Sequence, residues 1–159
     1  MIQVNERIEV PAPRQAVWDI LSNPRVVVEC VPGAELGEQQ ADGSWDAALV
    51  VKFGPAKVSF KARVMLDFQP ASMTGTVVSR GKDGIGGTRV QATMHFAVQD
   101  RGDPPGSVVP IDSDVEISGK LASLIETGAN LVVKRMVADF TERLTARVTA
   151  GLPAADSKA

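Results

Sequence analysis

The sequence contains few of the residue types that most often carry out chemistry in proteins. Its 159 residues include no tyrosine, one histidine and one cysteine. The single cysteine, Cys30, excludes an internal disulfide and fits a reducing compartment. No apolar run reaches the roughly 18 residues of a membrane-spanning helix, and charges interrupt residues 1–7, which do not resemble a signal peptide. We therefore expect a cytoplasmic protein.

The balance of charge gives no reason to expect nucleic acid as a partner. The chain has 17 basic and 19 acidic residues, for a net charge of −2, whereas nucleic-acid-binding domains are usually basic. Its length and its hydrophobic content of 44% suit one domain with its own core. We expect residues 1–150 to form this domain, and the small, polar residues 151–159 to be a disordered tail.

The C-terminal part of the chain predicts one long helix from Gly119 to Ala150. Apolar residues recur there at steps of three and four, which keeps their side chains on one helical face. The mean step, about 3.9 residues, exceeds the roughly 3.6 residues of a helical turn, and this suits a helix that crosses a twisted sheet. The face consists of Leu121, Ile125, Ala129, Val132, Met136, Phe140, Leu144 and Val148.

The part before this helix predicts an antiparallel sheet. Residues 56–68 alternate almost strictly between apolar and polar side chains, and such alternation gives a strand one buried face and one wet face. Further strands are expected at 2–10, from Leu36, and at 45–53, 73–79, 90–98 and 109–117, and short helices at 14–21 and 25–31. The expected fold class is therefore α+β, with a curved antiparallel sheet of about seven strands wrapped around a long C-terminal helix.

Four stretches of the sequence resemble one known family. They are Val17–Pro24 (VWDILSNP), Cys30–Leu36 (CVPGAEL), Lys52–Lys61 (KFGPAKVSFK) and Gly119–Ala122 (GKLA). On these stretches the chain resembles the carbon monoxide dehydrogenase CoxG family of the START-like (SRPBCC) superfamily. The Cys-X-Pro-Gly and Lys-X-Gly-Pro pieces are the most diagnostic. The resemblance extends over residues 3–148 and implies the helix-grip fold of that superfamily.

The resemblance also implies a function. Members of the family are expected to carry a hydrophobic molecule, a quinone or lipid, between sheet and helix, and to support a molybdenum-containing dehydrogenase without being enzymes or holding a cofactor. The implied location is the cytoplasm or the inner face of the membrane, as a peripheral protein. Ala62 and Ile125 stand where members often have glycine, and these larger residues would narrow a cavity.

The inner-face residues of the expected sheet and helix are the candidate ligand-binding residues. Ala62, Ala92 and Gly128 are small enough to leave space there, although a filled core would explain the same pattern. The candidates are Phe60, Ala62, Val64, Leu66, Ala92, Met94, Phe96, Leu121, Ile125, Gly128, Val132 and Met136. If the family arrangement holds, the loops with Pro32, Gly33, Gly54 and Pro55 form the entrance or a docking surface.

Residues with catalytic potential give weaker signals. His95 alternates with apolar neighbours and so points outward, and Cys30 has no partner thiol or histidine, which favours a buried helix-end thiol. Residues Gly81–Gly87 join two strands rather than a strand and a helix, so we expect a hairpin and no phosphate cradle.

No metal site and no catalytic group is expected. Asp112, Asp114 and Glu116 alternate to the outer face of a strand, which favours a solvated surface. No His, Cys and carboxylate set has metal-ligand spacing, and no titratable residue is assigned to the inner face. Two other functions stay open, namely a START-like cyclase or hydratase acting on an aromatic or polyketide substrate, and a pure docking module.

Overall fold

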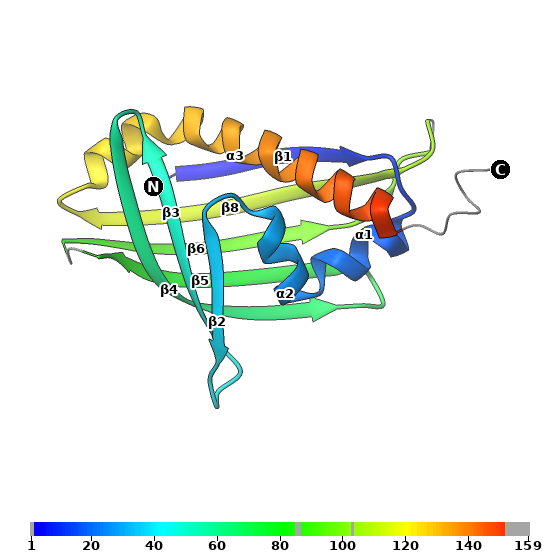
Figure 1. Cartoon of the computed structure of the whole chain (residues 1–159), viewed down its shortest axis with the longest axis horizontal. Helices are drawn as coiled ribbons and strands as arrows, with labels where there is room; N and C mark the ends of the chain where they lie inside the picture. Colours follow the sequence, from blue (N-terminus) through cyan, green and yellow to red (C-terminus); the bar gives the residue numbers. More distant parts are fainter. Residues whose placement is uncertain (1, 85–86, 103, 152–159) are drawn as a thin grey trace.

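One antiparallel sheet curves around one long helix, as expected (Figure 1). The computed structural model describes residues 2–84, 87–102 and 104–151. The strands of the sheet follow the order β1-β8-β6-β5-β4-β3-β2, and the short β7 pairs with β8. This arrangement confirms the α+β class and the curved sheet.

The element bounds agree closely with the sequence pattern. The strands are β1 (Ile2–Val10), β2 (Ala34–Gln39), β3 (Trp45–Phe53), β4 (Ala56–Gln69), β5 (Thr74–Asp83), β6 (Thr88–Ala97), β7 (Gln99–Asp100) and β8 (Ser107–Gly119). The helices are α1 (Arg14–Leu21), α2 (Pro24–Val27), the 3₁₀ turn η1 (Val28–Cys30) and α3 (Ala122–Gly151). The second short helix expected at 25–31 is thus α2 followed by η1.

The C-terminal helix begins at Ala122 and not at Gly119, so the expected start is wrong. Gly119 ends β8 with a φ of 110°, and a Cβ there would collide with the Gly87 carbonyl oxygen, so only glycine fits. The Thr88 hydroxyl then accepts a hydrogen bond of 2.8 Å from the Leu121 N–H. A sharp turn held by β6 therefore separates β8 from α3.

The predicted apolar face of α3 packs on the sheet. All eight of its residues are buried or half-buried, and Leu144 is fully buried. Leu131, which lies off this face, is 72% exposed. The pattern therefore predicted the correct orientation of the helix.

The inner face of the sheet holds two separate hydrophobic cores. The first, here called the aromatic core, includes Val10, Trp18 and Leu144, with Phe68 and Phe96 packed against it. The ring centroids of Trp18, Phe68 and Phe96 lie 5.9–6.3 Å apart, which is a favourable distance for aromatic pairs.

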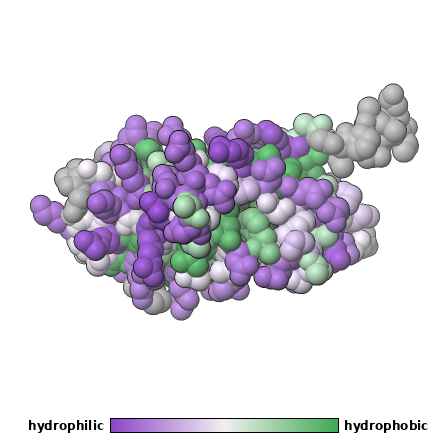
Figure 2. Space-filling view, turned by 90° about the horizontal axis from the view of Figure 1, so that it is seen from below, coloured by the Kyte–Doolittle hydropathy of each residue, from purple (hydrophilic) through white to green (hydrophobic). Residues whose placement is uncertain are grey.

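The second core lies near the β3–β4 hairpin. This hairpin core contains Val51, Phe53, Val58 and Ile125, so it joins the hairpin to the first turns of α3. Figure 2 shows hydrophobic residues in the middle of the face seen from below, with hydrophilic residues around them.

The end of the chain departs slightly from expectation. Gly151, expected in the tail, is the last residue of α3. Residues 152–159, the rest of the expected tail, lie outside the described residues.

Candidate functional site

Small side chains occupy the middle of the inner face on four neighbouring strands. Ala47 of β3, Ala62 of β4 and Gly81 of β5 lie directly opposite one another, and Ser79 of β5 lies opposite Ala92 of β6. We call these five residues the central tract. Each is only half-buried, although side chains in a filled core are packed to high density and excluded from water. The tract therefore differs from the cores on either side of it.

The twelve predicted ligand-binding residues fall into three groups. Phe60, Leu121, Ile125 and Val132 belong to the hairpin core, and Phe96 packs against the aromatic core. The others are half-buried and are members of neither core: Ala62, Val64, Leu66, Ala92, Met94, Gly128 and Met136. The register also puts Phe60 and Phe96 on the same face of the sheet. That these residues line a cavity remains a prediction.

Gly128 does not leave open space in the way the sequence indicated. A Cβ at this position would lie 3.2 Å from Cδ1 of Phe53, which is a tight contact. Phe53 belongs to the buried hairpin core, so the ring already fills the volume beside the glycine. Gly128 therefore serves close packing between α3 and β3, and the small residues of the sheet remain the better candidates.

Two carboxylates lie on the inner face, where no titratable residue was expected. Asp83 at the end of β5 is opposite Phe60 and is 5% exposed. Its Oδ1 accepts a hydrogen bond of 3.2 Å from the Gly87 N–H. Sequence reasoning missed it because β5 continues past Ser79 to Asp83 instead of ending in a long glycine-rich hairpin. Residues 85–86 of that hairpin lie outside the described residues.

Glu6 is the second carboxylate on this face. It alternates with Val4 and Ile8 along β1, and its side chain is 18% exposed. Lys134 of α3 lies 3.4 Å from Glu6 Oε2, so an ion pair joins the edge strand to the helix. The alternation of residues 2–10 already places Glu6 inward, and this was the available signal.

Trp45 borders the central tract. It lies opposite Val64, which in turn lies opposite Ser79. The Arg25 guanidinium of α2 is 5.2 Å from the centre of the Trp45 ring, a distance at which cation–π attraction operates. This contact connects α2 to β3 at one side of the inner space.

The predicted entrance loops lie at the same end of the sheet. The Gly33 carbonyl accepts a hydrogen bond of 3.0 Å from the Val50 N–H, and β3 then continues to the hairpin turn at Gly54 and Pro55. Gly33, Gly54 and Pro55 are exposed or half-buried, as is Pro32. The geometry thus brings the four residues to one end of the β3 strand, where the entrance remains a prediction.

The residues suspected of chemistry lie where alternation placed them. His95 is exposed on the outer face, where Nδ1 lies 3.0 Å from the Thr76 hydroxyl. The Cys30 side chain is 2% exposed, and burial raises the pKa of its thiol, with smaller effects from the charges around it. A thiol with a raised pKa is a poor nucleophile at neutral pH.

Neither a metal site nor a membrane span is found in the described part of the chain. Asp112, Asp114 and Glu116 are exposed, and no three His, Cys, Asp or Glu residues among those described are grouped to hold a metal ion. No described helix combines the length and hydrophobicity that crossing a bilayer requires.

Comparison with protein families identifies the chain's relatives. The model of the carbon monoxide dehydrogenase CoxG family matches residues 7–149. The chain belongs to this family. The match covers both cores and the central tract. No curated protein matches the sequence of this CoxG-family member.

Solved structures share the fold of this CoxG-family member at low identity. A conserved protein from Geobacillus kaustophilus is 20% identical, with 94% of this chain and 96% of that chain covered and a TM-score of 0.80. The Zhui aromatase/cyclase from Streptomyces sp. R1128 is 17% identical, with 97% of each chain covered and a TM-score of 0.65. A START superfamily protein from Mycobacterium smegmatis is 16% identical, with 93% and 97% covered and a TM-score of 0.57. The fold is therefore START-like, and at these identities the likeness concerns the fold alone.

Proposed function

We propose that this protein binds an apolar small molecule, a quinone or lipid, between the central tract and α3. The observation that carries the proposal is the half-buried state of the central tract between two packed cores. Apolar surface that remains in contact with water gains free energy when a ligand covers it, by about 25 cal/mol per Å². Ligand sites of this kind are mostly apolar with a few polar groups, and here Ser79 and Asp83 supply polar groups.

The family supports an accessory role for this binding. As a member of the carbon monoxide dehydrogenase CoxG family, the protein would deliver or withdraw its ligand for a molybdenum-containing dehydrogenase. It would work in the cytoplasm or as a peripheral protein at the inner face of the membrane, where quinones and lipids reside.

Decylubiquinone titration tests the binding directly. Trp45 borders the central tract, so a quinone bound there should quench its fluorescence saturably. Ala62→Leu fills the tract and should weaken the quenching by about tenfold or more, equivalent to about 1.4 kcal/mol. Ala138→Leu makes the same change at an exposed position of α3 and should leave the quenching unchanged.

Two further measurements complete this test. Trp45→Phe identifies the quenched residue, since Trp18 lies in the aromatic core. Native mass spectrometry with lipid extraction of freshly purified protein identifies the natural ligand. Equal quenching in wild type and Ala62→Leu would contradict a site at the central tract.

A second candidate function is catalysis on the bound molecule. The inner-face carboxylates Glu6 and Asp83 favour it, because an acid–base group must reach a bound substrate. A binding protein returns an extracted ligand unchanged after incubation, whereas an enzyme converts it. Mass spectrometry of the ligand before and after incubation with wild type and Asp83→Asn separates the two functions.

A further inference from the structure

The outer face of the sheet, opposite α3, contains a groove of about 980 Å³. It crosses the middle strands, and the side chains that line it are mainly those that point away from the central tract. We call it the outer groove. The carboxylates of its lining lie on β2, β3 and β8, to either side of the cations, and are Glu35, Asp46 and Glu116. Its cationic residues, on β4, β5 and β6, are Lys61, Arg63, Arg80, Lys82 and Arg89.

Like charges face one another across the strands of this groove. Lys82 of β5 lies directly opposite Lys61 of β4 on one side and Arg89 of β6 on the other. Arg63 lies opposite Arg80 in the same way. Directly opposite side chains on a sheet are roughly 4.5–5.5 Å apart at Cβ, and like charges at that distance destabilise the sheet. The repulsion is notable in a chain whose net charge is −2.

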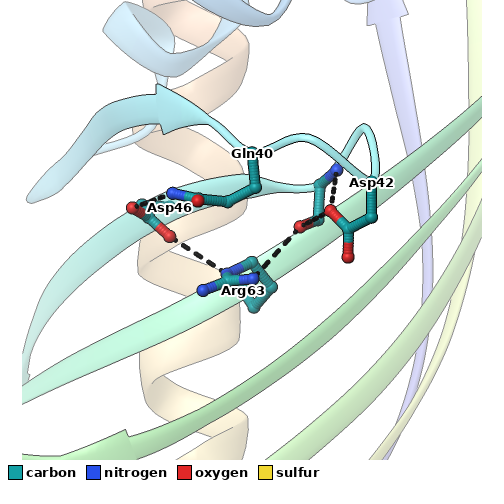
Figure 3. A network of polar contacts seen from close by, with 5 residues as sticks. Gln40, Asp42, Asp46 and Arg63 are labelled. Atoms are coloured by element: carbon teal, nitrogen blue, oxygen red, sulfur yellow. Dashed lines mark hydrogen bonds and ion pairs between the residues drawn. The ribbon is translucent and has the colours of Figure 1, made fainter.

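Only one of these cations has a carboxylate partner among the described residues. Arg63 is held by Asp46 at 3.0 Å and by the Ser44 hydroxyl at 3.4 Å (Figure 3). Asp42 accepts hydrogen bonds from Ser44, which lower the pKa of the Asp42 carboxyl. The β2–β3 hairpin therefore neutralises Arg63 at the margin of the groove.

The remaining cations are not neutralised in this way. Lys61, Arg80, Lys82 and Arg89 make no ion pair with any other residue of the described ranges. All four are exposed. Four uncompensated cations thus line one concave surface, and a ligand that carried negative charge would relieve their mutual repulsion.

We infer that the outer groove binds an acidic segment of a partner protein. Complementary charge is the attraction, and an extended chain with several carboxylates matches cations spread over three neighbouring strands. This binding goes beyond the proposed function, because it uses the face of the sheet opposite the ligand space. It would attach the protein to a partner while leaving the inner face free.

Other polyanions fit the groove less well. An anionic membrane is flat on this scale and does not enter a concave surface. Single-stranded nucleic acids bind through aromatic stacking as well as charge, and the lining of the groove contains no aromatic residue among those described.

A second copy of the chain also fits less well. Its exposed acidic residues Asp112 and Asp114 border a second hollow, of about 250 Å³. A hollow surface cannot fill a groove, so the acidic side of one copy does not complement the basic side of another.

Charge reversal at the centre of the groove tests the inference. The probe is a fluorescein-labelled oligoglutamate peptide of about ten residues, about 33 Å long when extended. We expect saturable binding by fluorescence anisotropy that weakens as salt screens the charges. Lys82→Glu should weaken it by about fivefold to tenfold, or about 1.4 kcal/mol at most. Arg135→Glu, the same charge change at an exposed position of α3, should leave it within about twofold.

The same variant has a second, independent readout. Lys82→Glu places a carboxylate opposite Lys61 and Arg89, which replaces repulsion by attraction. We therefore expect its melting temperature to rise while its peptide binding falls, an outcome that unfolding cannot produce. Quenching by decylubiquinone should be unchanged, so this inference and the proposed function fail separately.

Four results would overturn the inference. They are no saturable peptide binding at low salt, an equal loss in Arg135→Glu, groove-dependent binding of phosphatidylglycerol vesicles or an oligonucleotide in place of the peptide, and self-association in sedimentation that Lys82→Glu abolishes. The third would assign the groove to a membrane or a nucleic acid, and the fourth to a second copy.

Discussion

The two ends of the inner face differ from its middle in how completely they are packed. At the aromatic end, Trp18 is 4% exposed and Leu144 is fully buried. In the middle, Ala62 and Ala92 remain half-buried although their side chains are apolar and point toward the helix. Stability is thus concentrated at the ends, and the middle is free to serve another purpose. Four substitutions test this division, from the largest expected effect to the smallest.

The largest loss of stability is expected at the packed aromatic end. Leu144→Ala removes a fully buried side chain and should lower the free energy of unfolding by about 2–5 kcal/mol. Leu131→Ala makes the same change at a position that is 72% exposed and should stay within about 0.5 kcal/mol of wild type. Urea unfolding measures both. Equal effects would show that α3 does not pack through its predicted face.

A glycine at the same end sharpens the comparison. Gly75 of β5 faces Phe96 and Phe68, and a Cβ there would lie 2.6 Å from Cζ of Phe96. Gly75→Ala should therefore destabilise the protein by about 1–3 kcal/mol through overpacking. A change below about 0.5 kcal/mol would mean that the aromatic core can adjust as freely as the middle.

The middle should tolerate a much larger insertion. Ala62→Leu adds more volume than Gly75→Ala, yet we expect it to change the free energy of unfolding by less than about 1 kcal/mol. The new side chain would cover apolar surface that now contacts water. If Ala62→Leu unfolds the protein, the middle is a filled core and no ligand space exists.

The smallest effect is expected on the outer face. His95→Ala removes one exposed hydrogen bond, to Thr76, and should change stability by less than about 0.5 kcal/mol. Quinone quenching should also be unaffected, because the side chain points away from the ligand space. A loss of quenching in a folded His95→Ala variant would mean that the two faces are coupled.

Local patterns in the sequence were sufficient to predict most of the fold. The strand at 45–53 and the helix at 14–21 were predicted with the bounds observed, because side-chain periodicity is a local property. The start of α3 was predicted too early, since the turn at Gly119 is determined by the distant residues Gly87 and Thr88.

The candidate sites depend on which strands are neighbours, which a single sequence does not reveal. Ala47, Ala62 and Gly81 form one row only through the observed register, and Lys61, Lys82 and Arg89 face one another for the same reason. Gly128 was interpreted as open space because the sequence did not show that Phe53 would cover it.

The position of β1 has a consequence for the synthesis of the protein. β1 is the first strand to leave the ribosome, but it lies at the edge of the sheet and pairs only with β8, with Ile2 opposite Val115. Its Ile8 and Val10 belong to the aromatic core, which also requires Val148 near the end of α3. Contacts between such distant residues form slowly and leave apolar surface exposed until then. The nascent chain therefore cannot complete this core, or enclose a ligand, before α3 has been synthesised.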